Sequence, residues 1–191
     1  MKYIIFASVL TTVLIIAVIL AKYVSKRFGF SRSKTTAIFV VVSLMYTLSL
    51  LYFFGVAAIT VKGILFLFIL LISSSGDLKI RECDDYIHLM IVIAAFIGTE
   101  IKQIPGMILS GIFVMALMLI TVAVTKGEIG GADIKLSAAC SFLLGFQKGL
   151  TGLLIGLALA IIVNLIKAKN TKEGFPMIPY LAVGFMTAFI I

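Results

Sequence analysis

The chain is poor in charged residues and in the residues that build redox or metal sites. Only 13% of its 191 residues are charged, against about 25% in a typical soluble domain. The sequence contains no Trp, one His and two Cys. Cys83 and Cys140 form no CxxC pair, and together with His88 they make no plausible set of metal ligands. We therefore predict no metal, no cofactor, and reduced cysteines with a structural role.

Hydrophobic residues take the place of the missing charges. They make up 62% of the sequence, whereas roughly 45–50% is typical of soluble proteins. This composition predicts an all-α polytopic membrane protein, with one integral-membrane domain over residues 1–191. The formal net charge of +8 would suggest nucleic-acid binding in a soluble chain, but the Lys and Arg residues cluster between apolar runs, as topology signals do. We expect a lipid bilayer around the protein and no nucleic-acid partner.

The apolar residues fall into eight runs, which predict a transmembrane helical bundle of about eight membrane segments. The first run is long enough to cross a hydrocarbon core of about 30 Å, and no A-x-A-like cleavage site follows it, so we interpret it as a retained helix. The fourth run is marginal in length and fits a tilted, re-entrant or buried helix as well as a full span. The runs cover residues 3–21, 35–54, 63–75, 86–98, 107–124, 136–146, 150–166 and 175–191.

The positions of the positive charges predict which way the bundle faces. If the N-terminus is extracytoplasmic, only four of the sixteen Lys and Arg residues lie on that side, and the other twelve lie on the cytoplasmic side. The four are Lys2, Lys62, Lys102 and Lys148. The positive-inside rule therefore predicts an extracytoplasmic N-terminus for a multi-pass protein of the cell membrane. Residues 22–34, the densest basic stretch, are predicted to form a loop between the first two runs.

Two short motifs place an Asp at the edge of an apolar run. Asp77 closes the third run in the sequence Gly-Asp-Leu-Lys, and Asp133 precedes the sixth run in the sequence Gly-Gly-Ala-Asp-Ile-Lys. A charged Asp at the bilayer centre costs roughly 2.5–3.5 kcal/mol on insertion scales, so an acid at a membrane segment favours a functional role. The two runs between the motifs return the chain to the same face. We predict that Asp77 and Asp133 meet at the cytoplasmic face.

Two neighbouring carboxyl groups can hydrolyse a peptide bond without a metal or cofactor. One must be ionised to take a proton from water, and the other must be protonated to polarise the scissile carbonyl; nearby carboxylates share a proton for this reason. Asp77 follows an apolar run and Asp133 precedes one, so helix dipoles favour Asp77 as the acid and Asp133 as the base. Gly130 and Gly131 offer backbone that an extended peptide can approach closely.

The same motifs resemble those of the type IV prepilin peptidases and their preflagellin-cleaving relatives, which are GxGD-type intramembrane aspartyl proteases. The resemblance implies an aspartic-type endopeptidase that removes a short basic leader from a prepilin-like membrane protein, as in type IV pilus systems. It also implies that Asp77 and Asp133 are catalytic and that cleavage occurs at the cytoplasmic membrane face. The matching segments are Asp77-Leu78-Lys79, Gly130-Gly131-Ala132-Asp133-Ile134-Lys135-Leu136-Ser137-Ala138 and the proline-containing Phe175-Pro176-Met177-Ile178-Pro179-Tyr180-Leu181-Ala182.

The sequence departs from this family's pattern at three places. Ala132 stands where the glycine before the second aspartate usually is, and Cys83-Asp84-Asp85 replaces an Ile-Pro-Asn-like triplet after the first. The first basic loop also lacks the paired CxxC motifs of many bacterial members. Because that loop contains no Cys, His, Asp or Glu, it cannot build a metal-stabilised subdomain. We therefore predict a peptidase without the methyltransferase activity that some relatives carry.

Residues beside the two aspartates are candidates for binding the substrate. Acids in the segment after Asp77 could attract a basic leader, although each contributes under about 1 kcal/mol if it is exposed. A structural interpretation stays open, in which the acids form a solvated loop, the lysines anchor to lipid headgroups, and the glycines, Gly127 among them, form turns. The candidate substrate-binding residues are Glu82, Asp84, Asp85, Lys79, Lys135, Gly130 and Gly131.

Two other functions are compatible with intramembrane acids. One is a small multi-span transporter that uses Asp77 and Asp133 as a proton relay. The placement of both acids at one face argues against it, because a relay needs groups toward the other side, where Glu100 is the sole acid in the predicted topology. The other is a structural membrane subunit. His88 is expected at a membrane interface without a role.

Overall fold

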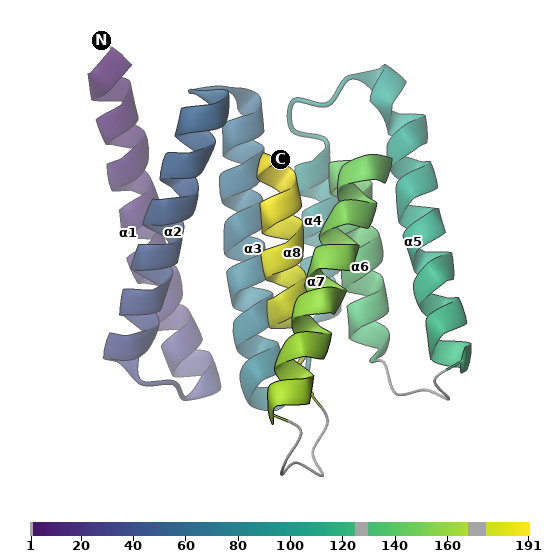
Figure 1. Ribbon diagram of the computed structural model, residues 1–191. Helices are drawn as coiled ribbons and strands as arrows, with labels where there is room; N and C mark the ends of the chain where they lie inside the picture. The colour runs from purple at the N-terminus through teal and green to yellow at the C-terminus, as the bar shows by residue number, and fades with distance from the viewer. Residues whose placement is uncertain (1, 125–129, 168–174) are drawn as a thin grey trace.

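The computed structural model describes residues 2–124, 130–167 and 175–191, and these residues form helices and connections without a strand (Figure 1). The all-α prediction is confirmed. Gly127, one of the glycines considered as turn residues, lies outside the described residues. The described elements are α1 (Lys2–Phe28), α2 (Arg32–Phe54), α3 (Ala58–Ile80), α4 (Asp85–Ala95), η1 (Ile101–Gln103), α5 (Ile104–Val124), α6 (Gly131–Leu144), α7 (Phe146–Lys167) and α8 (Ile178–Ile190).

Five of these helices, α1, α2, α3, α5 and α7, are long and apolar enough to cross a membrane. Their shortest described stretch, the 21 residues of α7, reaches about 32 Å at 1.5 Å per residue, which matches the hydrocarbon core. α4 has 11 residues, α8 has 13 and α6 has 14, so each is shorter than the core is thick. The chain is a multi-pass membrane protein, and the full count of eight membrane segments stays a prediction.

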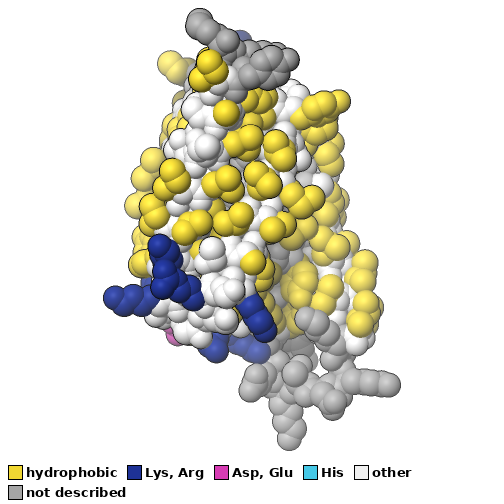
Figure 2. Space-filling view, turned by 90° about the vertical axis from the view of Figure 1, so that its left-hand side faces the viewer, with side chains coloured by type: hydrophobic (Ala, Val, Ile, Leu, Met, Phe, Trp, Pro, Cys, Tyr) yellow, Lys and Arg dark blue, Asp and Glu magenta, His cyan; other side chains and the backbone are white. Residues whose placement is uncertain are grey.

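The surface has the character expected of a protein in a bilayer. Figure 2 shows hydrophobic side chains over the height of one face, with Lys and Arg side chains gathered near its lower end. Large apolar side chains such as Ile15, Leu109 and Leu154 are each about 60% exposed or more. Lipid tails can cover such side chains, whereas water cannot do so without cost.

The helices run alternately up and down, so that both chain ends lie toward the same end of the bundle (Figure 1). As a result the last turn of α3 and the first turns of α4, α6 and α8 all lie at the opposite end. This arrangement brings Asp77 and Asp133 to one end of the molecule, as the sequence predicted. Which side of the membrane this end faces stays a prediction.

α3 and α8 form the centre of the bundle, and α8 lies directly against α7 and α3 (Figure 1). The close approach of α7 and α8 depends on glycine, because a Cβ at Gly184 would overlap the backbone of Gly152 and Gly156. A Cβ at Gly156 would in turn lie 2.8 Å from the Cα of Leu181. The glycines of α7 therefore fix how deep α8 sits and where its first residue points.

Helices extend beyond the apolar runs that predicted them. α1 continues through Lys22, Lys26 and Arg27, so its connection to α2 is only residues 29–31 and the predicted basic loop is wrong. Lys and Arg are good helix formers, and hydropathy alone does not record this. By the same reasoning α3 runs past Asp77 to Ile80, and α6 begins at Gly131. Both aspartates are therefore held on helices rather than in loops.

Candidate active site

Asp77 lies in the last turn of α3 and is only 8% exposed. Its Oδ2 accepts a hydrogen bond of 3.0 Å from the backbone N–H of Ile178, the first residue of α8. The first N–H groups of a helix have no partner within the helix, and the helix N-terminus favours negative charge. Asp77 therefore caps α8 from another helix, and this contact favours the ionised carboxylate.

Asp133 lies in the first turn of α6, and its carboxyl group folds back over Gly130, the residue that caps this helix. A Cβ built on Gly130 would lie 3.0 Å from Oδ2 of Asp133, so a side chain at position 130 would press on the carboxyl group. Oδ1 of Asp133 is buried and has no hydrogen-bond partner among the residues that the structure describes. A buried, unpartnered carboxyl oxygen is costly, and it is available to bind a water molecule or a substrate.

The two carboxyl groups form an electrostatic pair, since the charge of Asp77 acts directly on Asp133. Arg81, which ends α3 in a left-handed conformation with φ of 56°, places a positive charge within reach of Asp77. Two carboxylates in this relationship cannot both ionise without a large repulsion. The geometry therefore suits one proton shared between Asp77 and Asp133.

Cys83 lies beside both aspartates, in the connection between α3 and α4. Its Sγ is 3.1 Å from Oγ of Ser73 and 3.9 Å from Nε2 of His88. Burial raises the pKa of the Cys83 thiol, and the negative charges of Asp77, Asp84 and Asp133 raise it further. Cys83 is therefore a neutral thiol in the wall of the site, where we had expected only a structural cysteine.

His88 and Arg81 are neighbours of the site that the sequence analysis missed. His88 is 9% exposed, and its Nδ1 lies 4.0 Å from Oδ1 of Asp85, one turn earlier on α4. It is a packed wall residue rather than the interfacial side chain that we expected. Helical spacing could have found both residues, because Arg81 follows Asp77 by four positions and His88 follows Asp85 by three.

The acids after Asp77 are held in ion pairs. Oδ2 of Asp84 accepts a 2.7 Å hydrogen bond from Arg27 of α1, and Oδ1 of Asp85 accepts one of 2.7 Å from Lys135 of α6. Lys135 holds the pKa of the exposed Asp85 carboxyl below its usual range. Exposed ion pairs of this kind are weak, so a substrate's basic groups can displace them.

The remaining predicted binding residues lie in different surroundings. Lys79 lies over the ring of Phe30 at 5.8 Å, next to the connection between α1 and α2. Glu82 is exposed. Gly131 is also exposed, and a Cβ there would meet nothing within 4 Å, so its backbone is open to an approaching chain. Gly130 differs from Gly131, because its missing side chain is what leaves room for Asp133.

An apolar cavity of about 470 Å³ adjoins this end of the bundle between α4, α5 and α6. His88 and Lys135 line it near the site, and apolar side chains line the rest, including Leu89, Ile112 and Phe142. Among the described residues, no group of three or more His, Cys, Asp or Glu side chains is placed to hold a metal ion.

These observations define a class: a multi-pass helical membrane protein with two paired aspartates at one end of its bundle. A sequence profile of the type IV leader peptidase family matches residues 64–166, which is more than half of the chain. The chain belongs to the type IV leader peptidase family, and the predicted resemblance is confirmed at the level of this family. It is therefore a peptidase. Neither the curated proteins nor the solved structures gave a match. The matched region runs from α3 to α7 and contains both Asp77 and Asp133.

Proposed function

We propose that this protein is an aspartic-type endopeptidase in which Asp77 and Asp133 are the catalytic residues. The observation that carries the proposal is the pair itself: α3 and α6 bring two carboxyl groups into electrostatic contact, within the part of the chain that matches the family. The substrate that we propose is a prepilin-like membrane protein, cut behind a short basic leader at the cytoplasmic face of the cell membrane.

The surroundings of the two carboxyl groups suggest which of them holds the proton. Asp77 accepts the N–H of Ile178 at the positive end of α8, and the charge of Arg81 acts on it. Asp133 has a buried oxygen without a partner among the described residues, which penalises its charged form. We therefore propose that Asp77 is the general base and Asp133 the acid, which reverses the assignment that helix ends alone suggested.

In this proposal Asp77 takes a proton from a water molecule while that water attacks the scissile carbonyl carbon. Asp133 donates its proton to the carbonyl oxygen, so the tetrahedral intermediate forms without a free oxyanion. Collapse of the intermediate breaks the C–N bond. The proton now on Asp77 passes to the leaving amine, and one hydroxyl of the intermediate returns its proton to Asp133. Water is thereby added across the peptide bond, and the pair is left with one proton, as it began.

The site has an apolar side and an acidic side, which suit the hydrophobic helix and the basic leader of such a substrate. The apolar cavity between α4, α5 and α6 can hold one face of the substrate's hydrophobic helix. The exposed backbone at Gly131 leaves room for the extended segment that is cut. Glu82, Asp84 and Asp85 lie where a basic leader would follow, and its lysines would compete with Arg27 and Lys135 for Asp84 and Asp85.

Cleavage by the purified full chain tests this function. A peptide with a basic leader and a hydrophobic helix should be cut behind the leader, and mass spectrometry would detect the released fragment. Asp133→Asn should abolish cleavage, whereas Glu100→Gln, the same chemical change at an exposed acid paired with Lys102, should leave it intact. Proton flux through reconstituted protein that cuts no such peptide would instead support the transporter.

A further inference from the structure

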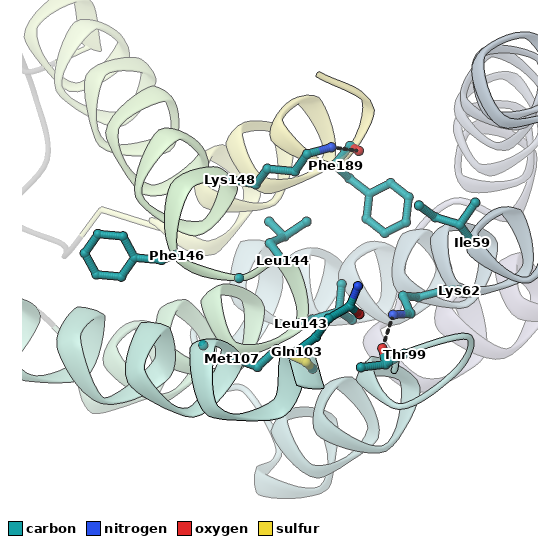
Figure 3. A pocket seen from close by; sticks show the side chains of 12 residues that line it. Ile59, Lys62, Thr99, Gln103, Met107, Leu143, Leu144, Phe146, Lys148 and Phe189 are labelled. Atoms are coloured by element: carbon teal, nitrogen blue, oxygen red, sulfur yellow. Dashed lines mark hydrogen bonds between the residues drawn. The ribbon is translucent and has the colours of Figure 1, made fainter. Parts of the chain in front are cut away.

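A second cavity lies at the end of the bundle away from the two aspartates, and it contains two lysines. Its volume is about 420 Å³, and residues of α3, α5, α6, α7 and α8 line it together with Thr99 (Figure 3). The two lysines are Lys62 of α3 and Lys148 of α7. The positive-inside rule places most Lys and Arg residues on the cytoplasmic side, and only four on the predicted extracytoplasmic side. Lys62 and Lys148 are two of these four, and both line this cavity.

Lys62 carries a charge that its neighbours do not neutralise. The residue is only 9% exposed, and its Nζ donates a 2.7 Å hydrogen bond to Oγ1 of Thr99. That hydroxyl donates onward to the carbonyl of Ala95 at 2.6 Å, so it is a neutral partner. Among the described residues that line the cavity, none is Asp or Glu. A buried ammonium without a counter-ion is strongly disfavoured, which points to an anion supplied from outside the chain.

Lys148 adds a second positive charge at the same place. It lies in the first turn of α7, and its Nζ donates a 3.2 Å hydrogen bond to the carbonyl of Phe189 near the end of α8. That carbonyl, at the negative end of α8, offsets part of the charge. The positive ends of α7 and α5 face this cavity at Phe146 and Gly106, and the negative end of α6 faces it at Leu144, so the helix ends partly offset one another. The balance of charge in the cavity is positive.

Apart from the two lysines, Thr99 and Gln103, the side chains that line the cavity are apolar. Ile59, Met107, Leu144 and Phe189 surround the two ammonium groups (Figure 3). A small inorganic anion would leave these walls without a partner. An amphiphile with a negative headgroup and acyl chains would use both the charges and the walls, and the end of a membrane bundle is where such headgroups lie.

We propose that this cavity binds a phosphate group, and that the group belongs to the headgroup of an anionic phospholipid. The ammonium groups of Lys62 and Lys148 each donate hydrogen bonds to phosphate oxygens, and the acyl chains pack on the apolar walls. The binding site exists only in the folded protein, where α3, α7 and α8 meet around the ligand. Ligand binding therefore stabilises the fold. The proposal concerns the opposite end from the aspartates and does not depend on the proposed peptidase function.

Lipid binding to the full chain in detergent tests the proposal. Native mass spectrometry and thermal unfolding would be followed during addition of phosphatidylglycerol, phosphatidylcholine, or inorganic phosphate together with phosphatidylcholine. We expect phosphatidylglycerol to bind more tightly than phosphatidylcholine and to raise the unfolding temperature. The double variant Lys62→Met/Lys148→Met should bind phosphatidylglycerol about tenfold or more weakly and lose this rise, because each charged hydrogen bond is worth about a factor of ten.

Lys102→Met is the matched control. Lys102 lies at the same end, is 79% exposed at its side chain, and pairs with Glu100 at 2.6 Å outside the cavity. The Lys102→Met variant should bind phosphatidylglycerol as the unchanged protein does and show the same rise in unfolding temperature. If the double variant does not fold, Lys148→Met alone should weaken phosphatidylglycerol binding about tenfold. The proposal is overturned if the lysine variants keep the response, if phosphatidylcholine binds equally well, or if inorganic phosphate alone reproduces the whole effect.

Discussion

The two ends of the bundle bury charges of opposite sign and treat them differently. At one end the carboxyl groups of Asp77 and Asp133 lie together, and the positive end of α8 and Arg81 act on Asp77. At the other end the ammonium groups of Lys62 and Lys148 share a cavity whose described lining contains no acid. At the first end, α8 and Arg81 offset the charge of Asp77 within the chain, whereas the second end needs a ligand for the same purpose.

This difference separates a catalytic arrangement from a binding arrangement. A pair of acids that must exchange a proton needs unequal surroundings, and the backbone N–H on Asp77 beside the unpartnered oxygen of Asp133 supplies them. Two lysines that hold an anion need no such inequality. Changes at the aspartate end test whether the unequal surroundings of the two carboxyl groups are needed for cleavage.

The largest expected effect follows from moving α8. In Gly184→Ala the new Cβ would overlap the backbone of Gly152 and Gly156, so α8 must shift and carry the Ile178 N–H away from Asp77. We expect a loss of about 1–3 kcal/mol in stability and a fall of about a hundredfold in cleavage rate. Thermal unfolding and initial rates measure the two effects. Gly106→Ala is the control, because its new Cβ would meet nothing within 4 Å and should not lower stability. Equal losses of stability and cleavage rate in the two variants would refute the argument.

A smaller effect is expected from crowding Asp133 directly. In Gly130→Ala the Cβ would lie 3.0 Å from Oδ2 of Asp133, so the carboxyl group must turn while the fold stays intact. Cleavage should slow by roughly tenfold to a hundredfold with little change in unfolding temperature. Gly131→Ala introduces a Cβ into open space and should have the smaller effect. A larger loss in Gly131→Ala would show that position 130 does not set the carboxyl geometry.

The smallest effect concerns the reactivity of Cys83. Burial and the nearby aspartates raise the pKa of its thiol, so less thiolate is present at neutral pH and labelling should be slow, rising about tenfold per pH unit. Asp84→Asn removes one negative charge near the thiol and should speed labelling roughly twofold to fivefold, because the charge of Asp84 also raises this pKa.

The same reagent tests orientation. With a membrane-impermeant thiol reagent, Cys83 should react from the cytoplasmic side only, while Cys140 is fully buried and should stay unlabelled. Labelling of Cys83 from outside intact cells would place the aspartates at the wrong face for the proposed substrate. Labelling that Asp84→Asn leaves unchanged would contradict the electrostatic argument.

The sequence was sufficient for the helices and for bringing the aspartates together, because both depend on local pattern. Apolar runs predict helices wherever the bilayer is the solvent, and two helices between the motifs return the chain to the same end. The confirmed family follows from the motifs around Asp77 and Asp133.

Contacts between distant residues were not readable from the sequence. The hydrogen bond from Ile178 to Asp77 joins residues 101 positions apart, and it decides how α8 acts on the site. The pairing of Arg27 with Asp84 spans 57 positions, and it forms because the fold brings the end of α1 to the connection that precedes α4. Lys62 and Lys148 looked like exceptions to a charge rule until the fold placed them in one cavity.

The central claim is that Asp77 and Asp133 share one proton, and carboxyl NMR on the full chain with ¹³C-labelled Asp tests it most directly. The chain has four Asp residues, so single Asn variants can assign each signal. The account predicts one protonated carboxyl group at neutral pH, on Asp133, and a change in the signal of either residue when the other becomes Asn. Two ionised carboxylates at neutral pH, or a signal of Asp77 that ignores Asp133→Asn, would contradict it.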